Sequence, residues 1–157
     1  MSTRRKHLRR LDEVWLPTPI YFLTACTEGR VSRLACDDFH SVAAEVWRTC
    51  ERLYGWVVGR YVVMPDHVHF FAADVRGERS LSYFVGKWKE WTAKNCSRRL
   101  MFPVPLWQPE FFDHLLRSSE SYDQKWEYVR SNPVRAGLVA TSEDWKFQGE
   151  LCQLRFD

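Results

Sequence analysis

Two histidines separated by one residue, His67 and His69, are the first candidates for chemistry in this 157-residue chain. They follow a turn-forming Met64-Pro65-Asp66 segment and open a run typical of a β-strand. Residues two apart in a strand project from the same face, so the imidazoles would lie side by side. Such a pair can share a divalent metal ion and leave positions for water or phosphate oxygens. Histidines that only form hydrogen bonds or lie at the surface would give the same pattern, so both interpretations stay open.

A second candidate is Tyr128, within a predicted helix that starts at Ser118 or Ser119 and runs to about residue 131. The residues at the spacing of a core-facing stripe are Tyr122, Trp126 and Val129. Tyr128 falls outside this stripe and shares its own face with Lys125 and Asn132, one turn before and after it. Phosphoryl transfer needs such an oxygen nucleophile with cations around it. A plain surface tyrosine, and an asparagine that caps the next helix, are the alternatives.

Residues 80–98 return to helical spacing, and one face of this second predicted helix is basic. Lys87, Trp91, Lys94 and Arg98 fall at i, i+4, i+7 and i+11. The cations can pair with phosphates and the indole can stack on a base, which suits single-stranded or hairpin nucleic acid. A helix face that is merely solvated would carry the same charges.

The elements that must position these residues follow from the hydrophobic pattern. It predicts a strand at 20–25, a helix from residue 38, two strands within 56–73, the helix at 80–98, an extended run within 106–116 and the tyrosine helix. This β-α-β-β-α-β order with a C-terminal helix is the split β-α-β arrangement of ferredoxin-like and RRM-like sheets, an α+β fold. We expect residues 19–157 to form one domain and residues 1–18 to form a basic arm. The basic residues of the arm are Arg4, Arg5, Lys6, Arg9 and Arg10.

Composition narrows the class of protein. The chain is 45% hydrophobic, 15% aromatic and 27% charged, which is typical of a globular protein. Its net charge of +3 permits a polyanionic partner without requiring one. Five cysteines form no Cys-x-x-Cys pair, which argues against a disulfide framework and a cysteine zinc site. The sequence shows neither a membrane-spanning apolar run nor a secretory signal pattern, so we expect a cytoplasmic protein without membrane association.

Four segments occur in the same order as in a known protein family. They read YVVMPDHVHFF, LSYFVGKWKEWTAK, LWQPEFFDHLLR and WEYVRSNPVRAGLV. The sequence resembles the REP-associated tyrosine transposases, which are single-tyrosine members of the HUH endonuclease superfamily. The resemblance runs from about Ile20 to Val139, and its most specific parts are the histidine hairpin and the end of the tyrosine helix.

The resemblance implies a site in which His67 and His69 bind Mg²⁺ or Mn²⁺ and Tyr128 forms a 5′-phosphotyrosine link, releasing a 3′-hydroxyl. Family members of this type act on single-stranded DNA with imperfect hairpins, the repeated extragenic palindromes. Related insertion-sequence transposases use a glutamine four residues after the tyrosine as third metal ligand. Asn132 stands there in this chain and is one methylene shorter, so direct ligation and a bridging water are both open. Lys125 is expected to contact DNA, and Gln108 is expected to contact DNA or to support the site.

The resemblance therefore favours a metal-dependent endonuclease or transposase that cuts and rejoins hairpin DNA, acting as a monomer or homodimer. A phenol is mostly protonated at neutral pH, so the metal, Lys125 or a water would have to activate Tyr128. The first alternative is a module on an RRM-like sheet that binds single-stranded or hairpin nucleic acid without catalysis. The second is a domesticated transposase that binds hairpin DNA as a regulator and no longer cuts.

Overall fold

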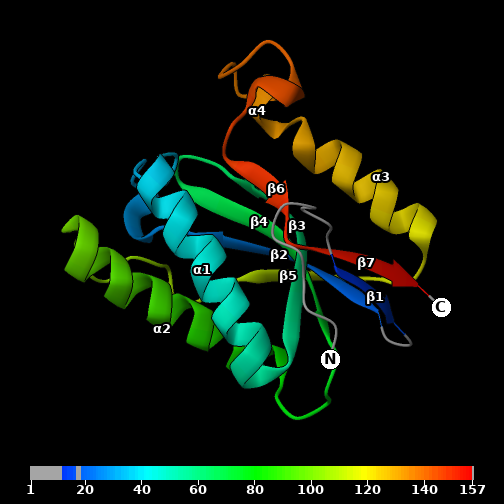
Figure 1. Cartoon of the computed structure of the whole chain (residues 1–157). Coiled ribbons are helices and arrows are strands. Elements are labelled where there is room, and N and C mark those ends of the chain that lie inside the picture. The colour runs from blue at the N-terminus through cyan, green and yellow to red at the C-terminus, as the bar shows by residue number, and fades with distance from the viewer. Residues whose placement is uncertain (1–11, 17–18, 157) are drawn as a thin grey trace.

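A five-stranded antiparallel sheet forms the centre of the computed structural model, which describes residues 12–16 and 19–156 (Figure 1). In spatial order its strands are β5 (Phe112–Leu116), β2 (Ile20–Cys26), β4 (His67–Asp74), β3 (Trp56–Val63) and β6 (Gln148–Glu150). The β2-α1-β3-β4-α2-β5 order, with α1 (Asp37–Tyr54) and α2 (Leu81–Leu100), is the predicted split β-α-β arrangement. The α+β fold class is thus confirmed.

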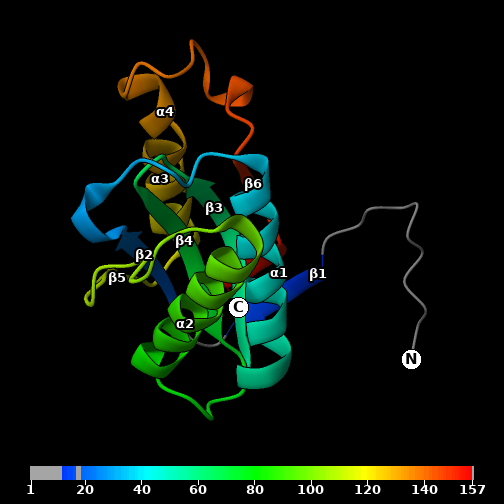
Figure 2. The same ribbon diagram turned by 90° about the vertical axis from the view of Figure 1, so that its left-hand side faces the viewer.

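The sheet separates two layers of helices. Helices α1 and α2 cover one face, as Figure 2 shows on the near side, while α3 (Ser119–Arg130) and the short α4 (Asn132–Arg135) lie over the other. The alternation of side chains along β4 explains this division. Val68 and Phe70 point into the core under α1 and α2, whereas Phe71 packs in a second core with Tyr122 of α3. His67 and His69 share the strand face of Phe71, so they lie on the α3 side.

Local signals in the sequence set the ends of the predicted elements. The turn Met64-Pro65-Asp66 joins β3 to β4, as expected. Ser80 caps α2, because its side chain accepts a hydrogen bond from the Tyr83 backbone N–H. Ser118 forms a capping box with Ser121 at the start of α3. These boundaries match the predictions from spacing and turn residues.

Three strands were not predicted. Strand β1 (Asp12–Leu16) pairs in parallel with β7 (Cys152–Phe156), and β6 adds to the edge of β3. The last part of the expected N-terminal arm is therefore a strand, while the basic cluster at residues 4–10 lies outside the described residues. Because β6 and β7 follow α3 in the chain, the helix that carries Tyr128 is not the last element.

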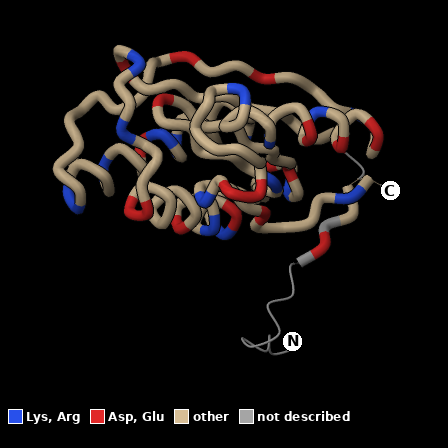
Figure 3. The backbone as a smooth tube through the Cα atoms, turned by 90° about the horizontal axis from the view of Figure 1, so that it is seen from above, with Lys and Arg blue, Asp and Glu red and all other residues tan. Residues whose placement is uncertain are grey.

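Charge is spread over the outside of the molecule. In the view of Figure 3, Lys and Arg positions are interspersed with Asp and Glu positions along the tube. None of the helices in residues 12–16 and 19–156 is long and apolar enough to cross a lipid bilayer.

Candidate active site

Strand β4 presents the two histidines next to each other on the face that α3 partly covers. The ring centroids of His67 and His69 are 4.7 Å apart and the ring planes meet at 77°. Both side chains are half-buried. The predicted side-by-side placement of the imidazoles is thus what the fold produces.

Both imidazoles are held through their Nδ1 atoms. His67 Nδ1 lies 2.7 Å from Oδ1 of Asp66, and Oδ2 of the same carboxylate accepts a 3.0 Å hydrogen bond from the Arg30 guanidinium. His69 Nδ1 lies 2.8 Å from the hydroxyl of Thr24, its cross-strand partner on β2. Neither Nε2 atom has a hydrogen-bond partner among the described residues. With the proton on Nδ1, each ring keeps its Nε2 lone pair for a ligand.

Electrostatics keep His69 in the neutral form that metal binding requires. Burial lowers the pKa of His69 to about 3, and the positive charges of His67, Lys125 and Arg135 add to this effect. Burial by itself raises the pKa of Asp66, yet its hydrogen bonds and charge contacts with His67 and Arg30 leave that pKa below its ordinary value. A neutral imidazole therefore stands beside one that is tethered to an ionised carboxylate.

Helix α3 brings Tyr128 to the same side of the sheet. The helix docks through the rings of Tyr122 and Trp126, whose centroids lie 5.0 and 6.1 Å from that of Phe71. Phe71 is the next residue after His69 on this face of β4, so the C-terminal half of α3 approaches the imidazoles. Tyr128 points away from the core and is 61% exposed, as predicted from its place outside the buried stripe.

Contacts of Lys125 link the tyrosine to the histidines. The Lys125 ammonium lies 4.8 Å from the ring centroid of Phe22 and 5.7 Å from that of Tyr128. Phe22 in turn stacks on His69 with a centroid distance of 5.2 Å. The ammonium thus contacts both the Tyr128 ring and the Phe22 ring that stacks on His69, and the predicted shared face of Lys125 and Tyr128 exists.

Arg135 of α4 contacts the Tyr128 ring and forms hydrogen bonds to three neighbouring residues. Its guanidinium carbon lies 4.0 Å from the ring centroid of Tyr128, and it donates a 2.8 Å hydrogen bond to the Tyr128 backbone carbonyl. It also donates to the hydroxyl of Ser131 and to the side-chain oxygen of Asn132. The Asn132 amide therefore lies next to the tyrosine with its oxygen turned towards Arg135.

No complete metal site is preformed by acidic, cysteine and histidine side chains. Within residues 12–16 and 19–156, no three such groups lie close enough together to hold one ion. The imidazole pair supplies two ligands at most. The predicted third ligand, Asn132, belongs to a different residue class, and its role as a ligand stays a prediction.

Gln108 lies beside the end of β2, and the hydrogen bonds that it donates go to the backbone of that strand end. Its backbone N–H donates to the carbonyl of Cys26, the residue that pairs with His67, and its side chain donates to the carbonyl of Thr27. Lys89 donates a 2.7 Å hydrogen bond to the carbonyl of Gln108. The residue thus supports the edge of the site, and its contact with DNA stays a prediction.

The basic stripe on α2 lies in the other layer of the molecule. Lys87 and Lys94 both pair with Glu90, at 3.4 and 3.1 Å. Trp91 donates a hydrogen bond to Tyr54, and Arg98 is exposed. The sheet separates this stripe from His67, His69 and Tyr128, so the structure does not bring the two sets together. The stripe remains a predicted nucleic-acid surface apart from the candidate active site.

Several residues at the site were not singled out as functional from the sequence. Thr24 and Phe22 meet His69 only because β2 pairs with β4, and that register is not visible in the local pattern. Asp66 was interpreted only as a turn residue. Arg135 could have been found, since it follows Asn132 by three residues and Tyr128 by seven, on one helical stripe.

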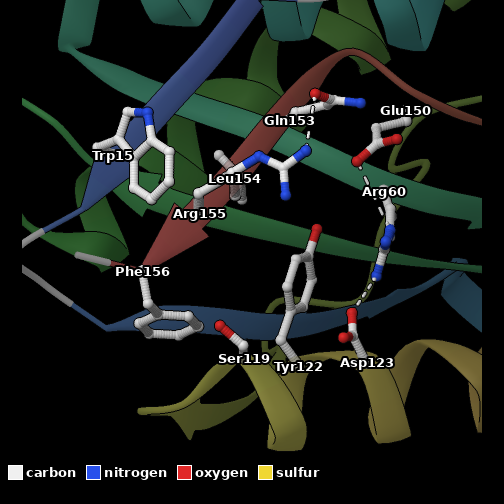
Figure 4. A pocket seen from close by; sticks show the side chains of 10 residues that line it. All are labelled: Trp15, Arg60, Ser119, Tyr122, Asp123, Glu150, Gln153, Leu154, Arg155 and Phe156. Carbon is white, nitrogen blue, oxygen red and sulfur yellow. Dashed lines mark hydrogen bonds and ion pairs between the residues drawn. The ribbon is translucent and has the colours of Figure 1, made fainter.

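A pocket of about 240 Å³ lies on the opposite flank of α3 (Figure 4). Its charged groups are largely paired with each other. Arg60 contacts Asp123 at 3.1 Å and Glu150 at 3.6 Å, and Arg155 contacts Glu13 at 2.6 Å. None of the residues predicted to act in catalysis or to bind nucleic acid lines this pocket. The candidate active site is instead the open surface around the imidazole pair.

Comparison with known proteins gives these residues a context. No model of a known protein family matches the chain. It is 25% identical over 127 residues to a REP-associated tyrosine transposase of Escherichia coli, covering 81% of this chain and 73% of the relative. A Haemophilus influenzae protein provisionally given the same name is 23% identical over 137 residues, covering 82% and 77%.

The fold has a close counterpart among solved structures. A REP-associated tyrosine transposase bound to a REP hairpin superposes with a TM-score of 0.72 at 23% sequence identity, covering 94% of this chain and 82% of that one. The predicted resemblance is thereby confirmed, and the shared architecture extends over nearly the whole chain.

Proposed function

Because this chain is similar in sequence and fold to REP-associated tyrosine transposases, we propose that it is a DNA-processing enzyme of the transposase type. It cuts and rejoins single-stranded hairpin DNA through a covalent bond to Tyr128. One observation supports this proposal: an exposed phenol on α3 lies beside two cations, on the side of the sheet that carries a histidine pair with free Nε2 atoms. The proposal includes the HUH mechanism inferred from the sequence.

His67 and His69 would hold the divalent cation, Mg²⁺ or Mn²⁺. The donor set fits such an ion, because Asp66 and Thr24 occupy the Nδ1 atoms and His69 is neutral. The oxygen of Asn132 keeps a second lone pair beside the one that Arg135 uses, so it can add a ligand directly or through water. A cation bound here supplies charge neutralisation at the phosphate.

The reaction at Tyr128 is a transesterification. The phenolic oxygen forms a bond to the phosphorus, the phenol proton is lost, and the bond from phosphorus to the 3′-oxygen breaks. The 3′-oxygen leaves as a hydroxyl after taking up a proton, and the 5′-phosphate stays on the tyrosine. Rejoining is the reverse attack by a 3′-hydroxyl. One phosphate ester replaces another, so no nucleotide cofactor is required.

Lys125 and Arg135 stabilise the charge that develops during this exchange. Their cationic groups lie 5.7 and 4.0 Å from the ring centroid of Tyr128, where they favour the phenolate and the negative oxygens of the phosphate. Arg135 is also a positioning residue, since it holds the Tyr128 carbonyl and the Asn132 amide at once.

The test is a cleavage assay with hairpin oligonucleotides drawn from palindromic repeats near the gene, in single-stranded and duplex form, with Mn²⁺. The wild-type protein should give a covalent adduct resistant to SDS on single-stranded hairpins. Tyr128→Phe should give none. His67→Ala should also stop cleavage while it keeps most of the DNA affinity, because backbone contacts provide most of that affinity.

The competing function is non-catalytic binding of nucleic acid on the RRM-like sheet. If the wild-type protein binds a verified cognate hairpin tightly and forms no adduct, non-catalytic binding replaces the enzyme proposal. Retention of cleavage in Tyr128→Phe would equally rule out the proposed nucleophile.

A further inference from the structure

Phe112, the first residue of β5, exposes 75% of its surface on an edge strand. Residues paired across neighbouring strands project to the same face of a sheet. Phe112 pairs with Thr24, and Thr24 pairs with His69. The three side chains therefore form one row across β5, β2 and β4, on the face that carries the histidine pair.

Helix α3 leaves this end of the row uncovered. Its ring contacts with the sheet go to Phe71 on β4, and it reaches Phe22 on β2 through the Lys125 ammonium. Two strand spacings separate Phe112 from His69, which is about 10 Å. An open aromatic ring thus stands within one or two nucleotide lengths of the proposed metal ligands.

The charge around the ring favours nucleic acid as its occupant. Lys125 extends from α3 over the ring of Phe22, which lies two residues from Thr24 on the same face of β2, and it has no carboxylate partner among the described residues. His114, also exposed, follows on the same face of β5 beside Phe22. An exposed ring on one strand, with an ammonium over the same face of the neighbouring strand, can stack an unpaired base while a phosphate of the same DNA strand pairs with the cation. An exposed aromatic residue on an edge strand without a ligand would favour pairing of that strand with another protein chain.

We propose that Phe112 is a stacking platform for an unpaired nucleobase of the DNA strand that runs through the active site. This proposal rests on the proposed function, because it places the base next to the phosphate that Tyr128 attacks. The platform sets the direction in which the strand crosses the sheet, from Phe112 on β5 past Thr24 to His69. Stacking requires only the face of a base, so the platform accepts more than one base type.

The test uses single-stranded oligodeoxynucleotides that carry one 2-aminopurine, without divalent metal so that no cleavage occurs. Base stacking on Phe112 should quench the 2-aminopurine emission when the wild-type protein binds. Phe112→Ala should remove the quenching and weaken binding by about 5- to 100-fold. Phe112→Tyr, which keeps a ring, should restore both. Phe112→Leu keeps apolar bulk without a ring and should behave like Phe112→Ala. The matched control is Leu53→Ala, an exposed apolar residue of α1 on the opposite layer.

The outcomes separate this proposal from the enzyme proposal. Equal quenching by the wild type and Phe112→Ala would overturn the platform, even if the Tyr128 adduct forms in the separate cleavage assay with Mn²⁺. Loss of quenching in Phe112→Ala, together with no wild-type adduct in that cleavage assay, would support the platform and overturn the enzyme proposal. A wild-type dimer in sedimentation that becomes monomeric in Phe112→Ala, with no change in DNA binding, would assign the surface to a second copy of the chain instead.

Discussion

At the scale of single residues, each imidazole of the pair is held by a different kind of group. Asp66 gives His67 a charged acceptor, and Thr24 gives His69 a neutral hydroxyl. A carboxylate partner raises the basicity of an imidazole and fixes its tautomer, so it strengthens metal ligation. His67 should therefore be the stronger of the two ligands, with His69 kept neutral by burial and nearby cations.

Replacing Asp66 with asparagine should weaken Mn²⁺ binding. An amide can still accept the hydrogen bond from His67, but it lacks the negative charge, so we expect a loss of about 10-fold in affinity, at the low end for outer-shell partners. Titration of Mn²⁺ followed by electron paramagnetic resonance measures the change. The control is Asp38→Asn in the exposed first turn of α1, and equal affinities in all three proteins would contradict the role of Asp66.

Arg135 offers a test of positioning within the site. Arg135→Lys keeps the positive charge but cannot make the same set of hydrogen bonds to Tyr128, Ser131 and Asn132. We expect the rate of adduct formation to fall by at least about 10-fold in this variant, with a smaller change in DNA affinity. Arg135→Ala should slow adduct formation at least as much, because it removes the hydrogen bonds and the positive charge together. A loss of DNA affinity in both variants, with an unchanged rate of adduct formation from bound DNA, would point to a purely structural role.

At the scale of elements, the position of Tyr128 depends on how α3 packs on the sheet. Gly59 of β3 makes this packing possible, because a Cβ atom there would lie 2.9 Å from Leu154 of β7 and 3.0 Å from the Tyr122 hydroxyl of α3. Gly59→Ala should therefore lower the free energy of unfolding by about 1–3 kcal/mol and slow adduct formation. Gly86→Ala on α2, where a Cβ meets no neighbour, should instead stabilise the helix. Chemical denaturation of both variants measures the difference, and equal stability would show that Gly59 does not control the docking of α3.

The sequence allowed most of these elements to be predicted, since each has a local signal. The stripe of Tyr122, Trp126 and Val129 indicated which side of α3 is buried and left Tyr128 free. The β1 and β7 pairing has no such signal, because it joins segments at opposite ends of the chain and depends on burial of Leu16 and Leu154 in the second core. The tether of His69 by Thr24 escaped prediction for the same reason, as strand register is a tertiary property.

At the scale of the whole molecule, the sheet separates the layer that carries the candidate active site from the layer formed by α1 and α2. The histidine pair, Tyr128 and Phe112 all lie on the α3 side, whereas the basic stripe of α2 lies on the other side. Lys94 of that stripe is paired with Glu90, while Lys125 stands among aromatic rings. A DNA strand that crosses the active site should therefore depend on Lys125 more than on Lys94.

Salt dependence of DNA binding distinguishes these two lysines. Lys125→Gln should reduce the slope of log affinity against log salt by about 0.7 to 1, the loss of one phosphate contact. Lys94→Gln should change the slope by less, because Glu90 already neutralises this ammonium. A larger effect from Lys94→Gln in fluorescence anisotropy titrations would mean that DNA binds across the α2 layer.

In the proposed reaction, the phenol of Tyr128 becomes bonded to a DNA phosphate. The most direct measurement is mass spectrometry of peptides from protein incubated with hairpin DNA and Mn²⁺, after nuclease digestion of the attached strand. The predicted result is a nucleotide joined through its 5′-phosphate to the phenolic oxygen of Tyr128. A nucleotide found on another residue, or only unmodified Tyr128 peptide after the DNA has been cut, would contradict it.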